Sequence, residues 1–283
     1  MARASVRTGD EFEKTIIKHF DRLTGRFGRW EIWADWITMS AIAISNTVDT
    51  VHRDERERTY RNIQGKYTTS EMQIMAEMLG LIVEGLDRNP DQDLLGDLFM
   101  RLELGNDHAG QFFTPYSICK AMAALTCPNL AGQIQEKGWI SVNDPTCGAG
   151  ALLVALANEC VRQDINYQQT VLFTGQDIDY TVGMMCYIQL SLLGCPGYIA
   201  IGDTIAHPTT AIDKRGLIPK DEGNVWYTPM YFRDVWNWRR VWEQVQLLCA
   251  TKKDLEPHSV KNSIRPEIRK TFAESENGQL TLF

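Results

Sequence analysis

The residues best suited to chemistry lie in one segment, Val142-Asn143-Asp144-Pro145-Thr146-Cys147-Gly148-Ala149-Gly150, between a predicted strand and a predicted helix. Gly148 and Gly150 carry no Cβ, so the backbone can approach a ligand closely. The amide groups at the start of the following helix favour electron-rich ligand atoms. Asp144 at the strand end would face a positively charged part of that ligand. Leu153 stands where a dinucleotide fingerprint has its third glycine, and a tight turn without a ligand is the alternative.

A repeating pattern of strands and helices would hold this segment in place. Short apolar runs alternate with helical patterns after Gly110, at residues 139–142, 171–174, 198–201 and 225–227. This alternation is typical of βαβ units, so we predict an α/β fold with a mainly parallel sheet. A last helix is expected at about 232–250.

The first 105 residues have helical periodicity throughout. Ser70 and Gln73 form a capping pattern for one helix, and Asp91 or Asp93 opens another. The apolar stretch 30–47 is predicted to be a buried helix, and the charge run 52–61 a solvated helix surface. We therefore predict a helical domain at 1–105, a second domain at 106–250 and a polar tail at 251–283.

Composition limits the function classes. The net charge of the 283-residue chain is −7, whereas a protein that binds DNA alone usually has a basic face. Five basic residues lie close together near the end of the chain: Arg233, Arg239, Arg240, Lys252 and Lys253. They could form a local basic patch, and a solvated helix surface is the alternative. The charge favours DNA contact through a partner.

The cysteines argue against two kinds of site. The chain has seven of them, an odd number without a Cys-x-x-Cys pair, which favours neither a disulfide framework nor zinc. We predict no metal, no membrane segment and a reduced, cytoplasmic setting.

Several segments resemble the methylation subunits of type I restriction-modification systems, a family of adenine-specific (N6) DNA methyltransferases. Residues 144–150 are similar to the family's glycine-rich S-adenosylmethionine motif, and 110–115 (Gly-Gln-Phe-Phe-Thr-Pro) to its Gly-Glu-Phe-Tyr-Thr-Pro motif. Residues 174–179 and 201–204 resemble the family's second-strand ending and its adenine-contacting segment. The resemblance implies a Rossmann-like S-adenosylmethionine-dependent methyltransferase core in a bacterial or phage-encoded protein.

The resemblance also assigns cofactor roles. Phe112 and Phe113 would line the methionine or adenine side of the pocket, Asp177 would accept both ribose hydroxyls, and Asp203 would contact the adenine. Thr114 is expected to cap the helix that follows it. The predicted cofactor-binding set is Phe112, Phe113, Thr114, Asp144, Thr146, Gly148, Gly150, Asp177 and Asp203.

The family's catalytic tetrapeptide, Asn-Pro-Pro-Phe or Asn-Pro-Pro-Tyr after the fourth strand, does not occur in this sequence. The nearest match is Thr228-Pro229-Met230-Tyr231, in which Thr228 could accept one hydrogen bond from a flipped adenine and Tyr231 could stack on the base. Loss of an acceptor would slow transfer by about 10²–10³-fold. An ordinary Thr-Pro turn is the alternative.

Little sequence follows Tyr231, so the substrate side of the cleft is expected to be incomplete or completed by another chain. One interpretation is an active DNA adenine-N6 methyltransferase. Another is an inactive S-adenosylmethionine-binding scaffold recruited to DNA by a sliding clamp or a partner subunit, and a third is a methyltransferase for a different substrate. A homo- or hetero-oligomer is compatible with each.

The chain ends in Gln279-Leu280-Thr281-Leu282-Phe283. This pentapeptide resembles the clamp-binding motif of bacterial replication proteins, in which the leucine and phenylalanine fill hydrophobic pockets. It predicts a bacterial sliding clamp as a partner; a C-terminus that folds back onto its own domain is the alternative.

Overall fold

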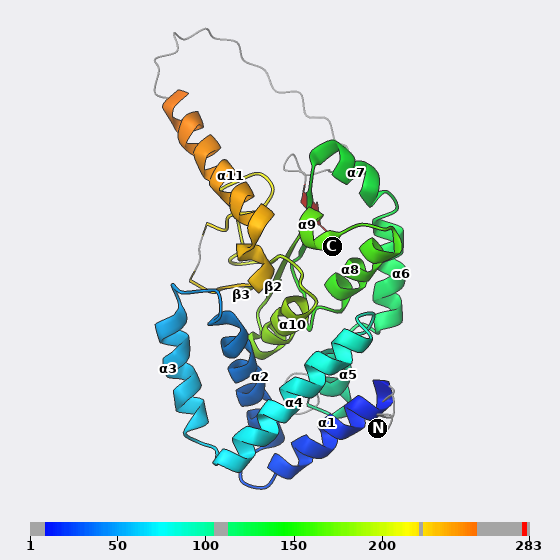
Figure 1. Ribbon diagram of the computed structural model, residues 1–283, viewed down its shortest axis with the longest axis vertical. Helices are drawn as coiled ribbons and strands as arrows, with labels where there is room; N and C mark the ends of the chain where they lie inside the picture. The colour runs from blue at the N-terminus through cyan, green and yellow to red at the C-terminus, as the bar shows by residue number, and fades with distance from the viewer. Residues whose placement is uncertain (1–8, 105–112, 221–222, 254–278, 282–283) are drawn as a thin grey trace, which may run out of the picture.

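A computed structural model describes residues 9–104, 113–220, 223–253 and 279–281 (Figure 1). The described helices are α1 (Gly9–Leu23), α2 (Arg29–Ser45), α3 (Arg53–Gln64), α4 (Thr69–Arg88), α5 (Leu94–Arg101), α6 (Tyr116–Thr126), α7 (Leu130–Lys137), α8 (Ala151–Arg162), α9 (Tyr167–Thr170), α10 (Tyr180–Leu192) and α11 (Asp234–Lys253), with a 3-10 helix η1 (Pro229–Phe232). The described strands are β1 (Ile140–Asp144), β2 (Val171–Asp177), β3 (Gly197–Ile201), β4 (Val225–Tyr227) and β5 (Gln279–Thr281).

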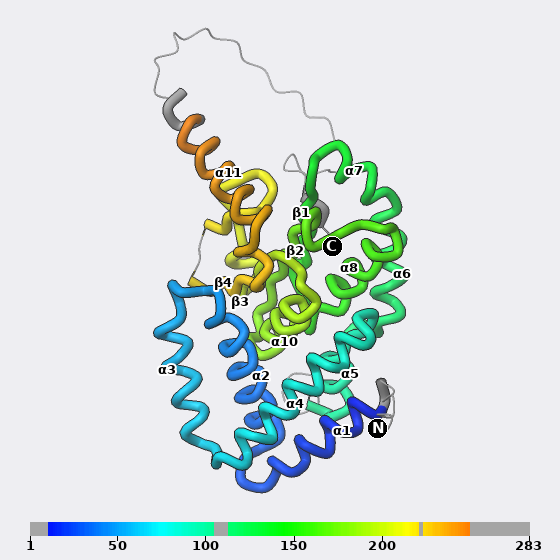
Figure 2. The backbone as a smooth tube through the Cα atoms, viewed as in Figure 1, coloured from blue at the N-terminus to red at the C-terminus, as the bar shows by residue number. Residues whose placement is uncertain are grey.

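The strands form one sheet in the order β4-β3-β2-β1-β5, and Figure 2 labels β1 to β4 in the middle of the molecule. β1 is parallel to both β2 and β5, and β2 is parallel to β3, whereas β4 is antiparallel to β3. The carboxyl ends of β1, β2 and β3 therefore meet at one edge of the sheet. The predicted α/β fold with a mainly parallel sheet is confirmed.

The two faces of the sheet are buried in separate cores. Val142, Phe173 and Ile199 belong to a core that includes α8, α10 and the N-terminal helices. Leu172 and Tyr198, on the opposite face, pack in a second core that includes Trp236 of α11. Alternate residues of a strand point to opposite faces, which explains this division. Because the first core runs from the N-terminal helices into the sheet, the two predicted domains pack on one another.

The predicted boundary at 105/106 lies in 105–112, outside the described residues, so the division into domains stays a proposal. The interpretation of 52–61 as a wholly solvated surface is wrong at one residue. Arg56 is buried in α3, where it donates to Asp49 Oδ2 at 2.7 Å and to the Val225 carbonyl at 3.0 Å. Its guanidinium also lies 3.8 Å above the Trp226 ring, so Arg56 joins the helical part of the chain to β4.

The start of α4 differs from the prediction, and the start of α5 decides between two predicted caps. α4 begins at Thr69, because its N-cap is Thr68, two residues before the predicted Ser70, and Thr68 forms a capping box with Glu71. Of the two aspartates considered for α5, Asp93 is the cap: its Oδ1 accepts from the Gly96 amide at 3.1 Å.

The C-terminal pentapeptide does not support the clamp prediction. Gln279–Thr281 pairs with Ser141–Asn143 as the parallel edge strand β5, which is the fold-back alternative; Leu282 and Phe283 lie outside the described residues. The polar tail begins later than 251, because α11 continues to Lys253. No helix in the described ranges is long and apolar enough to cross a membrane, and those ranges hold no group of three or more His, Cys, Asp or Glu residues that could bind a metal ion.

Candidate functional site

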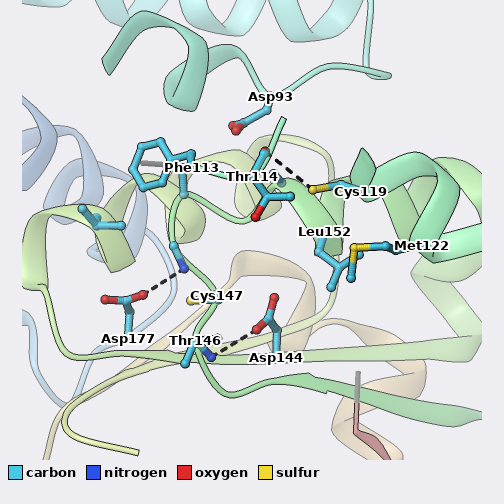
Figure 3. A pocket seen from close by; sticks show the side chains of 14 residues that line it. Asp93, Phe113, Thr114, Cys119, Met122, Asp144, Thr146, Cys147, Leu152 and Asp177 are labelled. Carbon is cyan, nitrogen blue, oxygen red and sulfur yellow. Dashed lines mark hydrogen bonds between the residues drawn. The ribbon is translucent and has the colours of Figure 1, made fainter. Parts of the chain in front are cut away.

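A pocket of about 400 Å³ lies at the carboxyl ends of β1 and β2 (Figure 3), within the range of small-molecule sites. Asp144 and Asp177 stand on one side of it, and Asp93, Phe113 and Thr114 on the other. The lining residues are Asp93, Phe113, Thr114, Cys119, Met122, Asp144, Thr146, Cys147, Gly148, Ala149, Ala151, Leu152, Asp177 and Val182. Six of the nine predicted cofactor residues are among them, a convergence from distant parts of the chain.

The glycine-rich turn is held in a backbone conformation that favours glycine. Gly148 has a φ of +55° and Gly150 a φ of +95°. A Cβ on Gly150 would lie 2.7 Å from Cys186 Sγ of α10, so this glycine allows close packing of two helices and does not line the pocket. The Gly148 amide donates to Asp177 Oδ2 at 2.9 Å, which joins the turn to the end of β2.

Two buried carboxyl groups, those of Asp93 and Asp144, and the partly buried carboxyl group of Asp177 make the pocket acidic. Burial raises the pKa of Asp144 and of Asp93 to about 6 and also raises the pKa of Asp177. Hydrogen bonds from backbone amides oppose this shift: Asp144 accepts from Thr146 at 3.1 Å, and Asp177 accepts from Asp179 at 2.9 Å. None of the lining residues named above is Lys, Arg or His, so the pocket suits a ligand with positive charge.

Asp93 was not predicted as a site residue, although its role as a helix cap was. The fully buried Gln189 of α10 holds it: Nε2 of Gln189 donates to Asp93 Oδ1 at 2.7 Å and to the Ala149 carbonyl at 2.8 Å. Gln189 Oε1 accepts from the Leu95 amide at 3.2 Å. One side chain thus connects α5, the glycine turn and α10, a long-range contact that no sequence pattern indicates.

An apolar wall completes the pocket. Phe113 and Leu152 contribute to it, together with Met122 of α6. The Phe113 ring would lie 3.6 Å from a Cβ on Gly148, so it covers the glycine turn. The prediction that Thr114 caps α6 is wrong, because Pro115 occupies the N-cap position and no side chain caps the helix. Phe112 lies outside the described residues.

Asp203 does not line this pocket. It lies in a neighbouring hollow with Gln176 and His207, and its Oδ1 accepts from the amides of Ile205 at 2.8 Å and Ala206 at 3.1 Å. These two amides lower the pKa of its carboxyl group. Its predicted contact with adenine therefore stays a proposal.

The predicted catalytic turn lies at the wrong end of the sheet. Because β4 is antiparallel to β3, its last residue, Tyr227, pairs with Tyr198 near the start of β3. Thr228 is fully buried there, donating to the Cys195 carbonyl at 2.7 Å and accepting from the Gly197 amide at 3.0 Å. Asp144 and Asp177 stand at the opposite, carboxyl ends of their strands.

The rest of the turn is equally occupied by structural contacts. The ring of Tyr231 stacks on Tyr227 with centroids 4.6 Å apart, and its hydroxyl donates to the Leu217 carbonyl at 2.6 Å. Pro229 opens the 3-10 helix η1. The prediction that Thr228, Pro229 and Tyr231 contact a base beside the cofactor is therefore incompatible with this geometry, and the ordinary-turn alternative fits it.

Thr228→Val tests this correction. Valine keeps the side-chain volume but leaves the buried Gly197 amide and Cys195 carbonyl without their hydroxyl partner, so we expect a loss of about 1–3 kcal/mol in the free energy of unfolding. Cofactor affinity should not change. Denaturant unfolding and calorimetric titration measure the two quantities, and the reverse outcome, unchanged stability with altered cofactor affinity, would reinstate Thr228 as a site residue.

Comparison with known families gives this geometry its context. The family model of the N-6 DNA methylases matches residues 91–240, more than half of the chain. This chain belongs to the N-6 DNA methylase family. The family uses S-adenosylmethionine, which confirms the predicted cofactor class and the Rossmann-like methyltransferase core.

Two solved structures are similar to the chain at low identity. One is a class I S-adenosylmethionine-dependent methyltransferase from Listeria monocytogenes, with 16% identity, a TM-score of 0.39, and coverage of 74% of this chain and 62% of that one. The other is a type I restriction-modification methyltransferase subunit from Streptococcus thermophilus, with 16% identity, a TM-score of 0.37, and coverage of 71% and 60%. The chain thus spans about three fifths of each. No curated protein matches it.

Proposed function

We propose that this chain binds S-adenosylmethionine in the acidic pocket and is the cofactor-binding half of a DNA adenine-N6 methyltransferase. The surface that holds the target adenine is then supplied outside the described residues or by another polypeptide. The observation that carries this proposal is the position of the Thr228 turn, at the amino-terminal end of β3, while the acidic residues gather at the carboxyl ends of β1 and β2.

The lining residues fit the cofactor's chemistry. When bound, S-adenosylmethionine supplies a methyl group on a positively charged sulfur, together with an ammonium group. Asp144 and Asp93 would face these charges, since no basic residue is among the lining side chains. Asp177 would accept the ribose hydroxyls through lone pairs that its two amide donors leave free. Phe113 would cover the apolar part of the ligand.

DNA and a second subunit are the partners that this proposal implies. β1 has β5 on its outer edge, and β5 pairs with only three of its residues. Among the described residues that line the pocket, none is Asn or Gln and Phe113 is the one aromatic residue, so the groups that hold the adenine would come from elsewhere. A catalytically inactive scaffold is the second candidate, and the same displaced turn favours it.

A methylation assay separates these cases. Calorimetry should detect saturable binding of S-adenosylmethionine to the purified chain. With labelled cofactor and unmethylated duplex DNA, we expect no label on the DNA from the chain alone. N6-methyladenine formed by the chain alone would overturn the half-site proposal in favour of a complete enzyme, and failure to bind the cofactor would overturn the proposal as a whole.

The pocket should bind its cofactor more weakly in acid. Asp144 and Asp93 ionise with pKa values of about 6, and a cationic ligand prefers the ionised groups. Affinity is therefore expected to fall by about tenfold per group between about pH 7 and about pH 5. The stability of the ligand-free chain should change with pH in the opposite direction. Between about pH 5 and about pH 7 the folded chain holds protons on these carboxyl groups that the unfolded chain has released, so the free energy of unfolding falls as pH rises.

Calorimetric titrations at both pH values, in buffers of different ionisation enthalpy, measure this linkage. Because the pKa values of Asp144 and Asp93 are about 6, binding of a cationic ligand should release protons near that pH. S-adenosylhomocysteine, whose sulfur is neutral, is the matched ligand and should show the smaller pH dependence. An affinity that stays constant across this range would show that the carboxyl groups do not face the ligand's charges.

A further inference from the structure

The helix α11 is fixed to the protein by one face. Trp236 is buried and its Nε1 donates to the Gln168 carbonyl at 2.7 Å. Arg239 donates to the Gln169 carbonyl at 2.6 Å, and the Arg240 guanidinium lies 4.4 Å above the Tyr231 ring. These contacts hold the first half of the helix, and Figure 1 shows the second half extending away from the other elements.

The opposite face of α11 carries an apolar stripe. Its members are between 42% and 71% exposed and are Trp238, Val241, Trp242, Val245 and Leu248. Spacings of three and four residues place them within an arc of about 120° at 100° per residue, and this arc is centred opposite Trp236 and Arg240. The stripe is therefore distinct from the face that anchors the helix.

The stripe is too large to be an incidental exposure of single residues. Two half- to three-quarters-exposed tryptophans and three aliphatic side chains offer on the order of 600 Å² of apolar surface, at the upper end of patches on monomeric proteins. A standard interface buries about 800 Å² per partner. The stripe and its immediate borders approach that size.

The features of the stripe favour a second copy of the same chain. Trp238, Val241, Val245 and Leu248 follow one another at spacings of three, four and three residues, the alternation that is typical of a helix-pairing seam. An antiparallel pair would place Trp238 against Leu248 of the other copy, large against small, whereas a parallel pair would oppose like tryptophans. The polar residues along its borders, Asn237, Gln244 and Gln246, are uncharged, so identical copies do not repel there. Asp234 lies on the same arc but a turn before Trp238, outside the paired segment.

We propose that two copies of this chain associate through an antiparallel pairing of their α11 helices, with the apolar stripe as the two-fold symmetric contact. Trp238 and Trp242 are its anchors, because buried tryptophans dominate the energetics of such interfaces. The anchored face leaves the stripe available for this contact without any movement of the helix.

Analytical ultracentrifugation of the full chain tests this. We expect a concentration-dependent dimer, and in the double variant Trp238→Gln/Trp242→Gln a dimer weakened by about 100-fold or more. The matched control is Leu125→Gln/Val161→Gln, which removes two exposed apolar residues of α6 and α8 and should dimerise like the wild type. Far-ultraviolet circular dichroism should show that all three proteins are folded.

Two results would overturn the proposal: a wild-type chain that stays monomeric at every concentration, or a tryptophan variant that dimerises as strongly as the wild type. The antiparallel direction has its own test at Cys249, which is exposed on α11. Its two copies would be offset by about 18 Å along the antiparallel pair, so mild oxidation should form no disulfide between them. A Cys249 disulfide dimer would instead show a parallel contact.

Discussion

Asp177→Asn is expected to weaken S-adenosylmethionine binding by about 10²–10³-fold, which corresponds to the loss of two charge-assisted hydrogen bonds. In the wild type, Oδ2 accepts from the Gly148 amide and Oδ1 from the Asp179 amide, each at 2.9 Å. Asparagine has one oxygen, so its NH₂ group would oppose one of these amides. The variant therefore loses a ribose acceptor and the link that holds the glycine turn.

Calorimetric titration measures the affinity, and thermal unfolding without ligand shows whether the turn alone is disturbed. Asp54→Asn is the matched control, since Asp54 is exposed on α3 and the change also removes one negative charge. Binding by Asp177→Asn that equals the wild type would reject the ribose contact. Weaker binding by both variants would point to overall charge instead of the pocket.

Gly150→Ala is expected to lower the free energy of unfolding by about 2–4 kcal/mol, because overpacking and a strained backbone act together. The added Cβ would lie 2.7 Å from Cys186 Sγ and 3.3 Å from the Cys186 Cα, at a φ of +95°. The backbone atom cannot rotate away, so α10 must shift. A shift of α10 also disturbs Gln189, which connects the turn to Asp93.

Gly148→Ala is the matched comparison. Its Cβ would meet only the Phe113 ring, at 3.6 Å, and its φ is +55°, so we expect a loss of about 1 kcal/mol. Adding Cys186→Ala to Gly150→Ala should recover part of the stability, since it removes the closest atom. Denaturant unfolding of the wild type, the two single glycine variants and the double variant measures these differences. Equal stability of Gly148→Ala and Gly150→Ala would contradict the packing described for Gly150.

The cofactor half of the site could be predicted from the sequence because its signals are local. The glycine turn follows a short apolar strand, and the ends of β1 and β2 lie at the same sheet edge in any parallel arrangement. The sequence alone therefore places Asp144, Gly148 and Asp177 in one region. The sequence also indicated Asp93 as one of two possible N-caps of α5.

The acceptor half was decided by tertiary structure alone. The apolar run 225–227 is a strand as predicted, but nothing in three residues indicates which neighbour it pairs with or in which direction. The burial of Tyr227 and Tyr231 against the second face of the sheet, and the contact of Arg56 with Trp226, accompany the antiparallel pairing with β3. Strand direction depends on such distant contacts, so the sequence by itself determined a cofactor pocket, and only the folded chain showed that the turn after β4 lies away from it.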